Sequence, residues 1–321
     1  LDAVMSAVVR GLARGREAHG VESSVLVSAM RNETAERSLE LAELAASWFG
    51  RGCCGFDLAG EAAGHPPKPH VEAFQLLKRM NGSSTIHAGE SFGPESIWQA
   101  LQFCGAHRIG HGTHLIDDMA VQDGKIVKRG SLATYVLDHR IPIECCLSSN
   151  VHTGAVRTIE EHPFPLFLRE GYRATLNTDN RLMSGVTMTD EFRVAHETFG
   201  CGLGDLERVT VNAMNAAFHP YAERHRIIDE RIAPAYRALA AKVEDGACRG
   251  RATRSTAALR AAGVARDPPV EARRGPGLRR GPGGIGRSGA DPGDARRVHA
   301  PGRKPVREQL GDRTLRRPRR R

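Results

Sequence analysis

The sequence feature that most constrains the fold is a short apolar run that returns about every 30 residues, followed each time by a helical pattern. The polar residues that end successive runs are 29, 30, 24, 37 and 31 residues apart. A (β/α)₈ barrel of about 250 residues uses roughly 31 residues per unit. The sequence therefore predicts an α/β chain with about six of the eight βα units of a TIM-like barrel. The six predicted strands are residues 24–29, 53–58, 84–87, 108–111, 142–147 and 174–178.

The stretches between these runs have apolar residues at helical spacing, which predicts amphipathic helices that cover the strands. Examples are residues 34–49, 94–104 and 190–199, and two more helical regions, 205–218 and 220–242, end the barrel domain. No run of 18 apolar residues and no secretory segment occurs, so we expect no membrane span and no export signal. Seven cysteines without a CxxC pair favour a reducing, cytoplasmic location.

The net charge of +9 comes from one end of the chain. Residues 247–321 contain 21 Lys and Arg against 6 Asp and Glu, whereas residues 1–246 contain 25 against 31. The C-terminal segment has no aromatic residue and is rich in Arg, Gly and Pro, a composition that cannot bury a core. We therefore predict two parts, a barrel domain at 1–246 and a disordered tail at 247–321.

Two interpretations of the tail stay open. A disordered basic arm would bind nucleic acid through counterion release. Alternatively, twenty arginines against one lysine is what translating GC-rich DNA in a shifted frame would produce, and we favour this second interpretation. Apart from the tail, we expect no nucleic-acid partner.

Polar residues suited to catalysis stand where the predicted strands end. His87, His111 and Asp179 each follow a different run, and Glu90 comes three positions after the first of them. In a barrel these ends meet at one face, where enzymes assemble their sites from several loops. His87 and Asp179 are suitable Zn²⁺ ligands, Glu90 can move protons, and His111 can hold or deprotonate a water. The pattern predicts a metal-dependent hydrolase.

At these residues the chain resembles adenosine deaminases, particularly the bacterial ones. The resemblance extends from residue 1 to about residue 242 and rests on several motifs in one order. The motifs are DLAG at 57–60, HAGE at 87–90, RIGHGTH at 108–114, SSN at 148–150 and LNTDNRLMSG at 176–185.

The resemblance implies hydrolytic deamination of adenosine and 2′-deoxyadenosine at C6, which yields a 6-oxopurine nucleoside (inosine from adenosine) and ammonia. His87 and Asp179 would be ligands of one zinc ion, and no organic cofactor would be needed. Glu90 would donate a proton to N1 of the purine. His111 would orient the attacking hydroxide and stabilise the tetrahedral adduct. Gly60 would offer its backbone N–H to N3.

The chain departs from the family pattern at the position that contacts N7 of the purine. Many members carry an aspartate there, and this chain has Asn180. An amide donates a hydrogen bond to N7 at any pH, whereas an aspartate must first be protonated. We assign Asn150 to structural support and His114 to the polar rim of the site.

A second departure concerns the metal. The family's first strand supplies a His-x-His pair of zinc ligands, and no His-x-His occurs in these 321 residues. With two ligands instead of four, zinc would bind weakly. We expect that the sequence starts after the first two βα units and changes frame near Gly246. Because two strand edges would then be unpaired, we expect the chain as written to fold poorly and to be inactive.

Other functions remain open at this stage. The substrate could be another 6-aminopurine, such as adenine or an aminofutalosine-type nucleoside. Alternatively, the chain would not be an enzyme but a non-catalytic barrel whose basic tail binds nucleic acid. The sequence does not predict an oligomeric state.

Overall fold

The computed structural model describes residues 1–244. The predicted tail at 247–321 and the predicted boundary at residue 246 lie outside the described residues, so both stay predictions. Within the described part, no helix is long and apolar enough to cross a membrane.

All six predicted strands are present and run parallel to their neighbours. The strands β1 and β2 pair with each other, and the other four pair in the order β3-β4-β7-β8. A backbone hydrogen bond of 3.0 Å from Phe56 N to Ser83 O connects β2 to the start of β3. The spatial order thus follows the chain order, as in a (β/α) barrel. These strands are β1 Val25–Met30, β2 Cys53–Ala59, β3 Thr85–Ala88, β4 Arg108–His111, β7 Ile143–Cys145 and β8 Ala174–Leu176.

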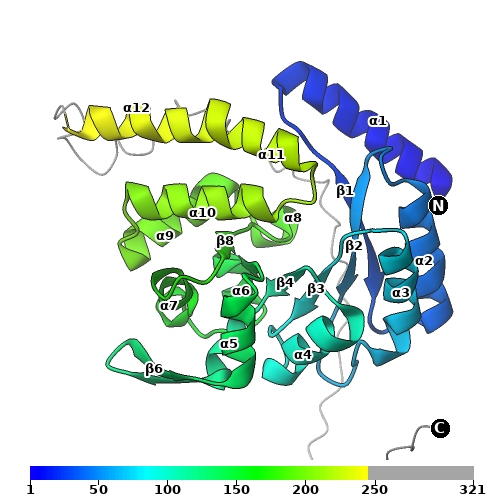
Figure 1. Ribbon diagram of the computed structural model, residues 1–321, viewed down its shortest axis with the longest axis horizontal. Coiled ribbons are helices and arrows are strands. Elements are labelled where there is room, and N and C mark those ends of the chain that lie inside the picture. The colour runs from blue at the N-terminus through cyan, green and yellow to red at the C-terminus, as the bar shows by residue number, and fades with distance from the viewer. Residues whose placement is uncertain (245–321) are drawn as a thin grey trace, which may run out of the picture. The chain divides into compact units, whose positions relative to one another are not determined.

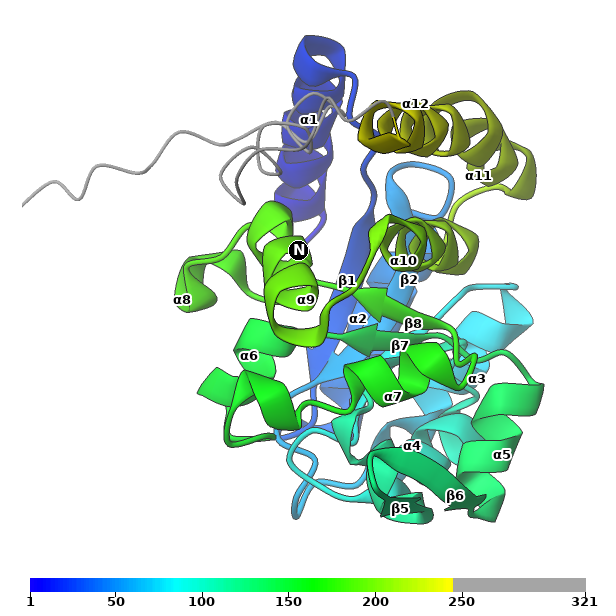
Figure 2. The ribbon, with the colours of Figure 1, turned by 90° about the vertical axis from the view of Figure 1, so that its left-hand side faces the viewer.

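The helix α1 precedes the first strand, and the later α-helices follow strands, with several of them packing directly against a strand. In Figure 1, α2 and α3 lie beside β1 and β2, and Figure 2 shows α9 and α10 beside β8. The helices are α1 Asp2–His19, α2 Ala35–Ser47, α3 Val71–Arg79, α4 Pro94–Gln99, α5 Ser131–Asp138, α6 Leu147–His152, α7 Phe164–Arg169, α8 Arg181–Ser184, α9 Met188–Phe199, α10 Leu203–Ala216, α11 Tyr221–Ile227 and α12 Ala233–Glu244.

Local sequence signals explain where several helices begin. The Thr34 side chain accepts a hydrogen bond from Arg37 N and caps α2. Thr187 and Asp190 form a capping box at the start of α9. The region 220–242, predicted as one helical stretch, is α11 and α12 joined by a π-helical turn at Ile228–Ile232. The sequence therefore predicted the helical content here but not the break.

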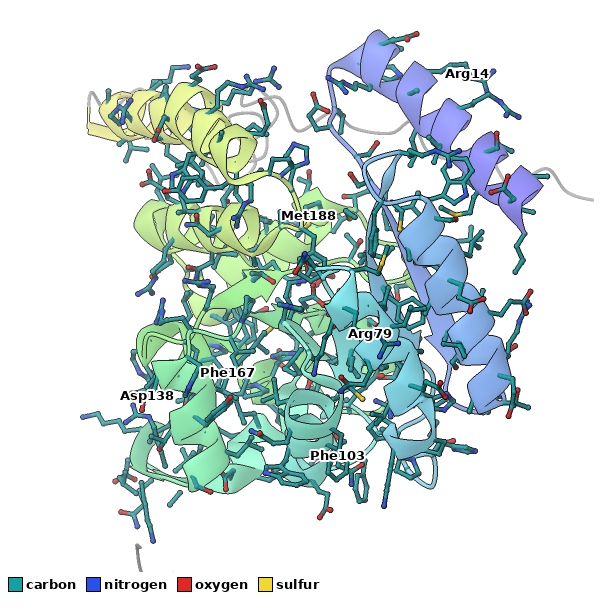
Figure 3. All side chains as sticks on the ribbon, turned by 45° about the vertical axis from the view of Figure 1, so that its right-hand side comes forward. Arg14, Arg79, Phe103, Asp138, Phe167 and Met188 are labelled. Carbon is teal, nitrogen blue, oxygen red and sulfur yellow. The ribbon has the colours of Figure 1, made fainter. Side chains whose placement is uncertain are left out.

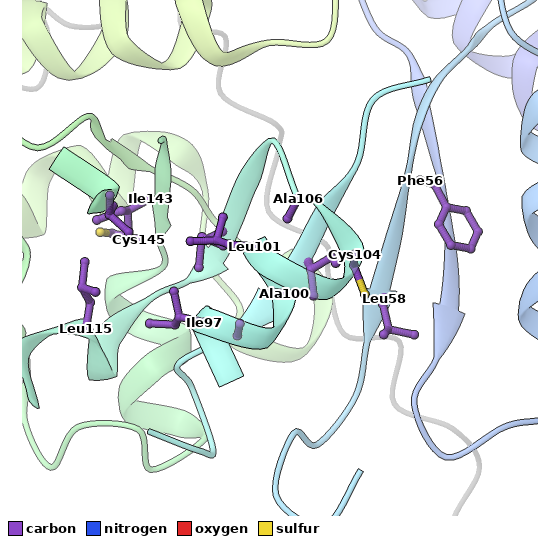
Figure 4. Close-up of a cluster of buried hydrophobic side chains, with 14 of the residues drawn as sticks. Phe56, Leu58, Ile97, Ala100, Leu101, Cys104, Ala106, Leu115, Ile143 and Cys145 are labelled. Carbon is purple, nitrogen blue, oxygen red and sulfur yellow. The ribbon is translucent and has the colours of Figure 1, made fainter. Parts of the chain in front are cut away.

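A continuous apolar core joins the strands to their helices. Figure 4 shows Ile97 and Leu101 of the α4 region facing Ile143 and Cys145 of β7. Side chains fill the space between helices and strands, and Phe167 lies among them, whereas Asp138 lies at the outer edge (Figure 3). Buried parallel strands have nearly continuous apolar sequences, so their positions could be predicted from the apolar runs.

The structure also contains an antiparallel hairpin that the sequence analysis did not predict. Strands β5 (Met119–Gln122) and β6 (Lys125–Arg129) are joined by Asp123 and Gly124, which have φ angles of 50° and 68°. Two positive φ angles are typical of the type I′ turn, for which Asp-Gly is a preferred sequence. The Asp-Gly pair between residues with strand propensity was the signal that could have revealed it.

We predict that Phe74→Ala lowers the free energy of unfolding by about 3–5 kcal/mol, because it removes a buried ring and leaves a cavity. Phe74 is 1% exposed and meets Phe56 edge-on with 5.5 Å between the ring centroids. Urea unfolding followed by circular dichroism measures the change. Phe92→Ala is the control because Phe92 is 44% exposed. Equal losses for the two variants would contradict this core assignment.

Candidate active site

The residues predicted from three strand ends meet in space. His87 lies in β3, His111 ends β4, and Asp179 follows β8. One potential ligand atom from each of the three lies within 4.8 Å of the other two. The His87 and His111 rings are tilted against each other with 4.9 Å between their centroids. The carboxyl ends of the parallel strands therefore bring together groups that are far apart in sequence.

The backbone at two of these residues is strained. His111 has φ of 64° and Asp179 has φ of 52°, in the left-handed region that non-glycine residues rarely occupy. Such strain persists only where surrounding contacts hold it, and it is common at functional sites. At Asp179 one such contact is a hydrogen bond of 2.6 Å from Ser149 Oγ to Oδ2. The strand ends thus aim these two side chains at a cost in local stability.

Asp57 orients His87 from the neighbouring strand. Its Oδ1 lies 3.0 Å from His87 Nδ1, and its Oδ2 accepts a hydrogen bond of 2.9 Å from Ser28 Oγ. Burial alone would lower the pKa of His87, but the Asp57 carboxylate raises this pKa to about 9. A carboxylate on Nδ1 fixes the ring and keeps a proton on that nitrogen. This leaves Nε2 as the atom that faces the site.

The tautomer of His111 is set by a chain of hydrogen bonds that begins at a backbone amide. The N–H of Phe164, the first residue of α7, donates to His162 Nδ1 at 3.0 Å, so neutral His162 carries its proton on Nε2. His162 Nε2 then donates to Asn150 Oδ1 at 3.1 Å. The amide nitrogen of Asn150 donates to His111 Nδ1 at 3.0 Å. His111 in its neutral form therefore carries its proton on Nε2.

This proton points toward Glu90. His111 Nε2 lies 3.5 Å from Glu90 Oε2, and the His111 side chain is 3% exposed. Burial lowers the pKa of His111, which favours the neutral ring. Burial, together with the nearby His111, lowers the pKa of His162 to about 3, so His162 is neutral near pH 7. The neutral forms that the hydrogen-bond chain requires are thus the forms that burial favours.

The predicted substrate-contacting residues lie at the same end of the strands. Gly60 follows β2 with φ of 92°, and its N–H donates to no acceptor in the described part of the chain. Asn180 caps α8, with its Oδ1 accepting a hydrogen bond of 3.1 Å from Met183 N. Because Oδ1 is engaged, the NH₂ group is the part of Asn180 left for a ligand. His114 instead pairs with Asp117 on the rim.

Three further residues, Arg31, Asp57 and His162, support the site through hydrogen bonds, and no role for them was predicted from the sequence. Arg31 is 3% exposed and donates to the backbone carbonyl oxygens of His65 and His87. Asp57 lies within a motif that the sequence analysis quoted, so its burial after an apolar run was a usable signal. Arg31 carried no such signal, because its carbonyl partners lie in other segments of the chain. His162 carried none either, because it reaches His111 only through Asn150.

The side chains that meet at this site are of the types that bind metal ions. Catalytic zinc sites use three protein ligands, typically His and carboxylate, with a water in the remaining position. His87, His111 and Asp179 offer two imidazoles and a carboxylate, and Asp57 supplies the carboxylate support that metal-bound histidines usually have. His111 already has Asn150 on Nδ1 and Glu90 near Nε2. That arrangement leaves His87 and Asp179 as the ligands with the fewest competing contacts.

The chain is similar to adenosine deaminases over most of the described residues. The sequence profile of the family described as adenosine deaminase matches residues 1–234. An adenosine deaminase of Mycobacterium sp. (strain JLS) is 49% identical over 245 residues, which is 75% of this chain and 67% of the relative. Adenosine deaminase 1 of Streptomyces coelicolor is 49% identical over 244 residues, 74% of this chain and 61% of that protein. The chain thus spans about two thirds of the length of these curated relatives.

Solved structures with the same fold include other deaminases. The adenine deaminase of Arthrobacter aurescens superposes with a TM-score of 0.63 at 21% identity, covering 71% of this chain and 66% of that one. An amidohydrolase from Burkholderia ambifaria with bound Zn superposes with a TM-score of 0.66 at 16% identity, covering 75% and 64%. At these identities the likeness establishes the fold alone, which is that of a (β/α) barrel. The predicted fold class is thereby confirmed.

We predict that His162 makes stability depend on pH between about pH 6.5 and pH 3. In this window the unfolded chain binds a proton at His162, whose ordinary pKa is about 6.5, whereas the folded chain does not until about pH 3. The free energy of unfolding therefore falls as the pH is lowered through the window. In His162→Gln this contribution is absent, so the difference between the wild type and the variant should shrink from pH 6.5 downward.

Urea unfolding at a series of pH values measures this difference. His19→Gln is the control, because His19 is an exposed residue at the end of α1. A difference between the wild type and His162→Gln that stays constant over the window would show that His162 is protonated equally in both states.

Proposed function

Because this chain belongs to the adenosine deaminase family, we propose that its site carries out the zinc-dependent hydrolytic deamination of adenosine and 2′-deoxyadenosine. The family and the hydrolase class, both predicted from the motifs, are confirmed by the match over residues 1–234 and by the 49% identity to adenosine deaminases. The observation that carries the proposal for this chain is the convergence of His87, His111 and Asp179 beside Glu90.

The spatial arrangement of the site residues suits the addition of water to a purine ring. Glu90 is half-buried, and in its protonated form it would donate to N1, which makes C6 more electrophilic. His111 is held beside Glu90 as the Nε2-protonated tautomer, so it would donate a hydrogen bond to the oxygen that attacks C6. Asp179 Oδ2 is held by Ser149, so the carboxylate keeps one orientation while it accepts the water's hydrogen bond. These groups need no organic cofactor.

His87 and Asp179 would hold the zinc ion in this proposal. Zinc, when bound, would lower the pKa of a water toward neutrality and so supply a nucleophile near pH 7. The Zn-bound amidohydrolase from Burkholderia ambifaria supports this choice of metal. Two protein ligands bind zinc more weakly than the three of ordinary catalytic sites, so we expect low affinity for zinc in this chain. An affinity this low would leave the chain inactive without added zinc.

Two residues would recognise the purine. The N–H of Gly60 is free of described partners and would donate to N3. The NH₂ group of Asn180 would donate to N7, while its Oδ1 remains the cap of α8. This donor is present at every pH, because an amide does not titrate. The rest of the purine is proposed to lie between these two donors and Glu90.

The remaining predictions about function stay open. Adenine and an aminofutalosine-type nucleoside are alternative substrates, because Asn180 would also serve another 6-aminopurine. The nucleic-acid function rests on the tail, which lies outside the described residues. A cytoplasmic location agrees with the six unpaired cysteines of residues 1–244.

A substrate panel tests the proposed function. The chain is titrated with Zn²⁺ and assayed for ammonia release from adenosine, 2′-deoxyadenosine, adenine and aminofutalosine. Turnover of the first two substrates that rises with zinc and is lost in Asp179→Asn would support the proposed function and overturn the prediction that this chain is inactive as written. Preference for adenine or aminofutalosine would show that the proposed substrates are wrong. Absence of both turnover and purine binding at saturating zinc would overturn the function for this chain.

We predict that Glu90→Gln lowers kcat by about 10²–10⁴-fold with little change in KM, because the amide keeps the shape of the side chain but cannot deliver a proton. Steady-state assays at the zinc concentration found above measure both constants. Glu95→Gln is the matched control, because Glu95 is exposed in α4 and its carboxylate accepts a hydrogen bond from Gln99, away from the site. A fall in kcat of less than tenfold for Glu90→Gln would remove Glu90 from this role.

A further inference from the structure

A cavity of about 510 Å³ lies at the amino ends of the strands, at the opposite end from His87, His111 and Asp179. Its walls come from residues that precede or begin β3, β4, β7 and β8, and from the segment between α10 and α11. Pockets of 300–1,000 Å³ are of the size that holds small molecules. The catalytic residues do not reach this cavity, because parallel strands have their two kinds of ends at opposite edges.

The cavity is lined by arginines and by no carboxylate from the described residues. Arg108, Arg140, Arg173 and Arg224 contribute to its wall. Arg108 is neutralised by an ion pair of 2.7 Å with Glu144. The other three have no carboxylate partner within residues 1–244. Three positive charges therefore share one cavity without a described counter-charge.

Backbone contacts anchor two of these guanidinium groups and leave donors free. Arg140 donates one N–H to the carbonyl oxygen of Gly171, and Arg224 donates one to the carbonyl oxygen of Asn215. The Nε of Arg224 is buried and has no hydrogen-bond partner among the described atoms. The side chain of Arg173 likewise donates to no group that the structure describes. The wall thus holds guanidinium N–H donors for which residues 1–244 supply no acceptor.

The arginines also act on one another. Burial lowers the pKa of Arg173, and the neighbouring charges of Arg140 and Arg224 lower this pKa further. Like charges that are close together destabilise the folded chain, and an anion between them would remove the repulsion. The planar guanidinium group matches the oxygens of a phosphate, to which it donates two parallel hydrogen bonds.

We propose that this cavity is a binding site for a phosphorylated small molecule, with Arg140, Arg173 and Arg224 around the phosphate group. A phosphate offers enough oxygens to accept from all three guanidinium groups. The organic part of the ligand would occupy the volume of the cavity that the phosphate group leaves unfilled. This site is separate from the proposed deaminase site and does not depend on the proposed function.

Isothermal titration calorimetry of the full chain with ribose 5-phosphate, inorganic phosphate and ribose tests the proposal, with chloride used to match the ionic strength. We expect ribose 5-phosphate to bind and ribose not to bind. Tighter binding of ribose 5-phosphate than of inorganic phosphate supports a phosphate ester as the ligand, and equal binding supports free phosphate. Binding of neither phosphate compound overturns the proposal.

The variant Arg173→Gln distinguishes binding at this site from non-specific attraction of anions. We expect the variant to bind ribose 5-phosphate at least about tenfold more weakly, because it loses a charge-assisted pair of hydrogen bonds. We also expect the ligand-free variant to unfold at a higher temperature than the wild type, because one of three repelling charges is gone. A protein that merely needed Arg173 for structure would unfold at a lower temperature.

Arg157→Gln is the matched control, because it makes the same charge change at a side chain that is 86% exposed and lies outside the cavity. We expect its affinity for ribose 5-phosphate to equal that of the wild type. If Arg173→Gln does not fold, Arg173→Lys keeps the charge but loses the planar pair of donors, and weaker binding is again expected. Equal loss of affinity in the Arg157 and Arg173 variants would overturn the site.

Discussion

The parallel hydrogen-bond ladder is the interaction on which the other features of this chain depend. It aligns β1 and β2, and then β3, β4, β7 and β8, so that each of these six strands contributes its carboxyl end to the same side of the fold. A shift of one residue in any pairing would turn the side chains of that strand to the opposite face. Backbone pairing therefore places His87 opposite Gly110 and Ala88 opposite His111. Side-chain contacts orient the groups within the positions that this register sets.

Much of this arrangement could be predicted because the relevant signals are local. Five of the six parallel strands are largely buried and appear as short apolar runs, whereas β1 is exposed at Ser28 and Met30. The spacing of the runs shows that they alternate with helices. The residues after the runs share one edge of the sheet in any parallel arrangement, which is why His87, His111 and Asp179 were identified without a structure. The hairpin at β5–β6 also had a local signal, the Asp123–Gly124 pair.

Features built from distant and individually ordinary residues could not be predicted. Arg31 follows the first strand and resembles many surface arginines, but its carbonyl partners are 34 and 56 residues away. The cavity arginines come from four separate segments, and none stands out in its own surroundings. Their significance arises only because the fold gathers Arg140, Arg173 and Arg224 at one place where residues 1–244 supply them no carboxylate partner. Such sites depend on three-dimensional proximity, which spacing along the chain does not encode.

The hydrogen-bond chain behind His111 begins at the main-chain amide of residue 164, which no side-chain substitution alters except one. Nineteen of the amino acids supply an N–H at that position, and proline does not. The segment reads Pro163-Phe164-Pro165, so a proline stands on each side of the only suitable donor. Deleting Pro163, or inserting one residue between His162 and Pro163, would put a proline in that place. The segment should therefore accept changes of side chain during evolution far more readily than changes of length.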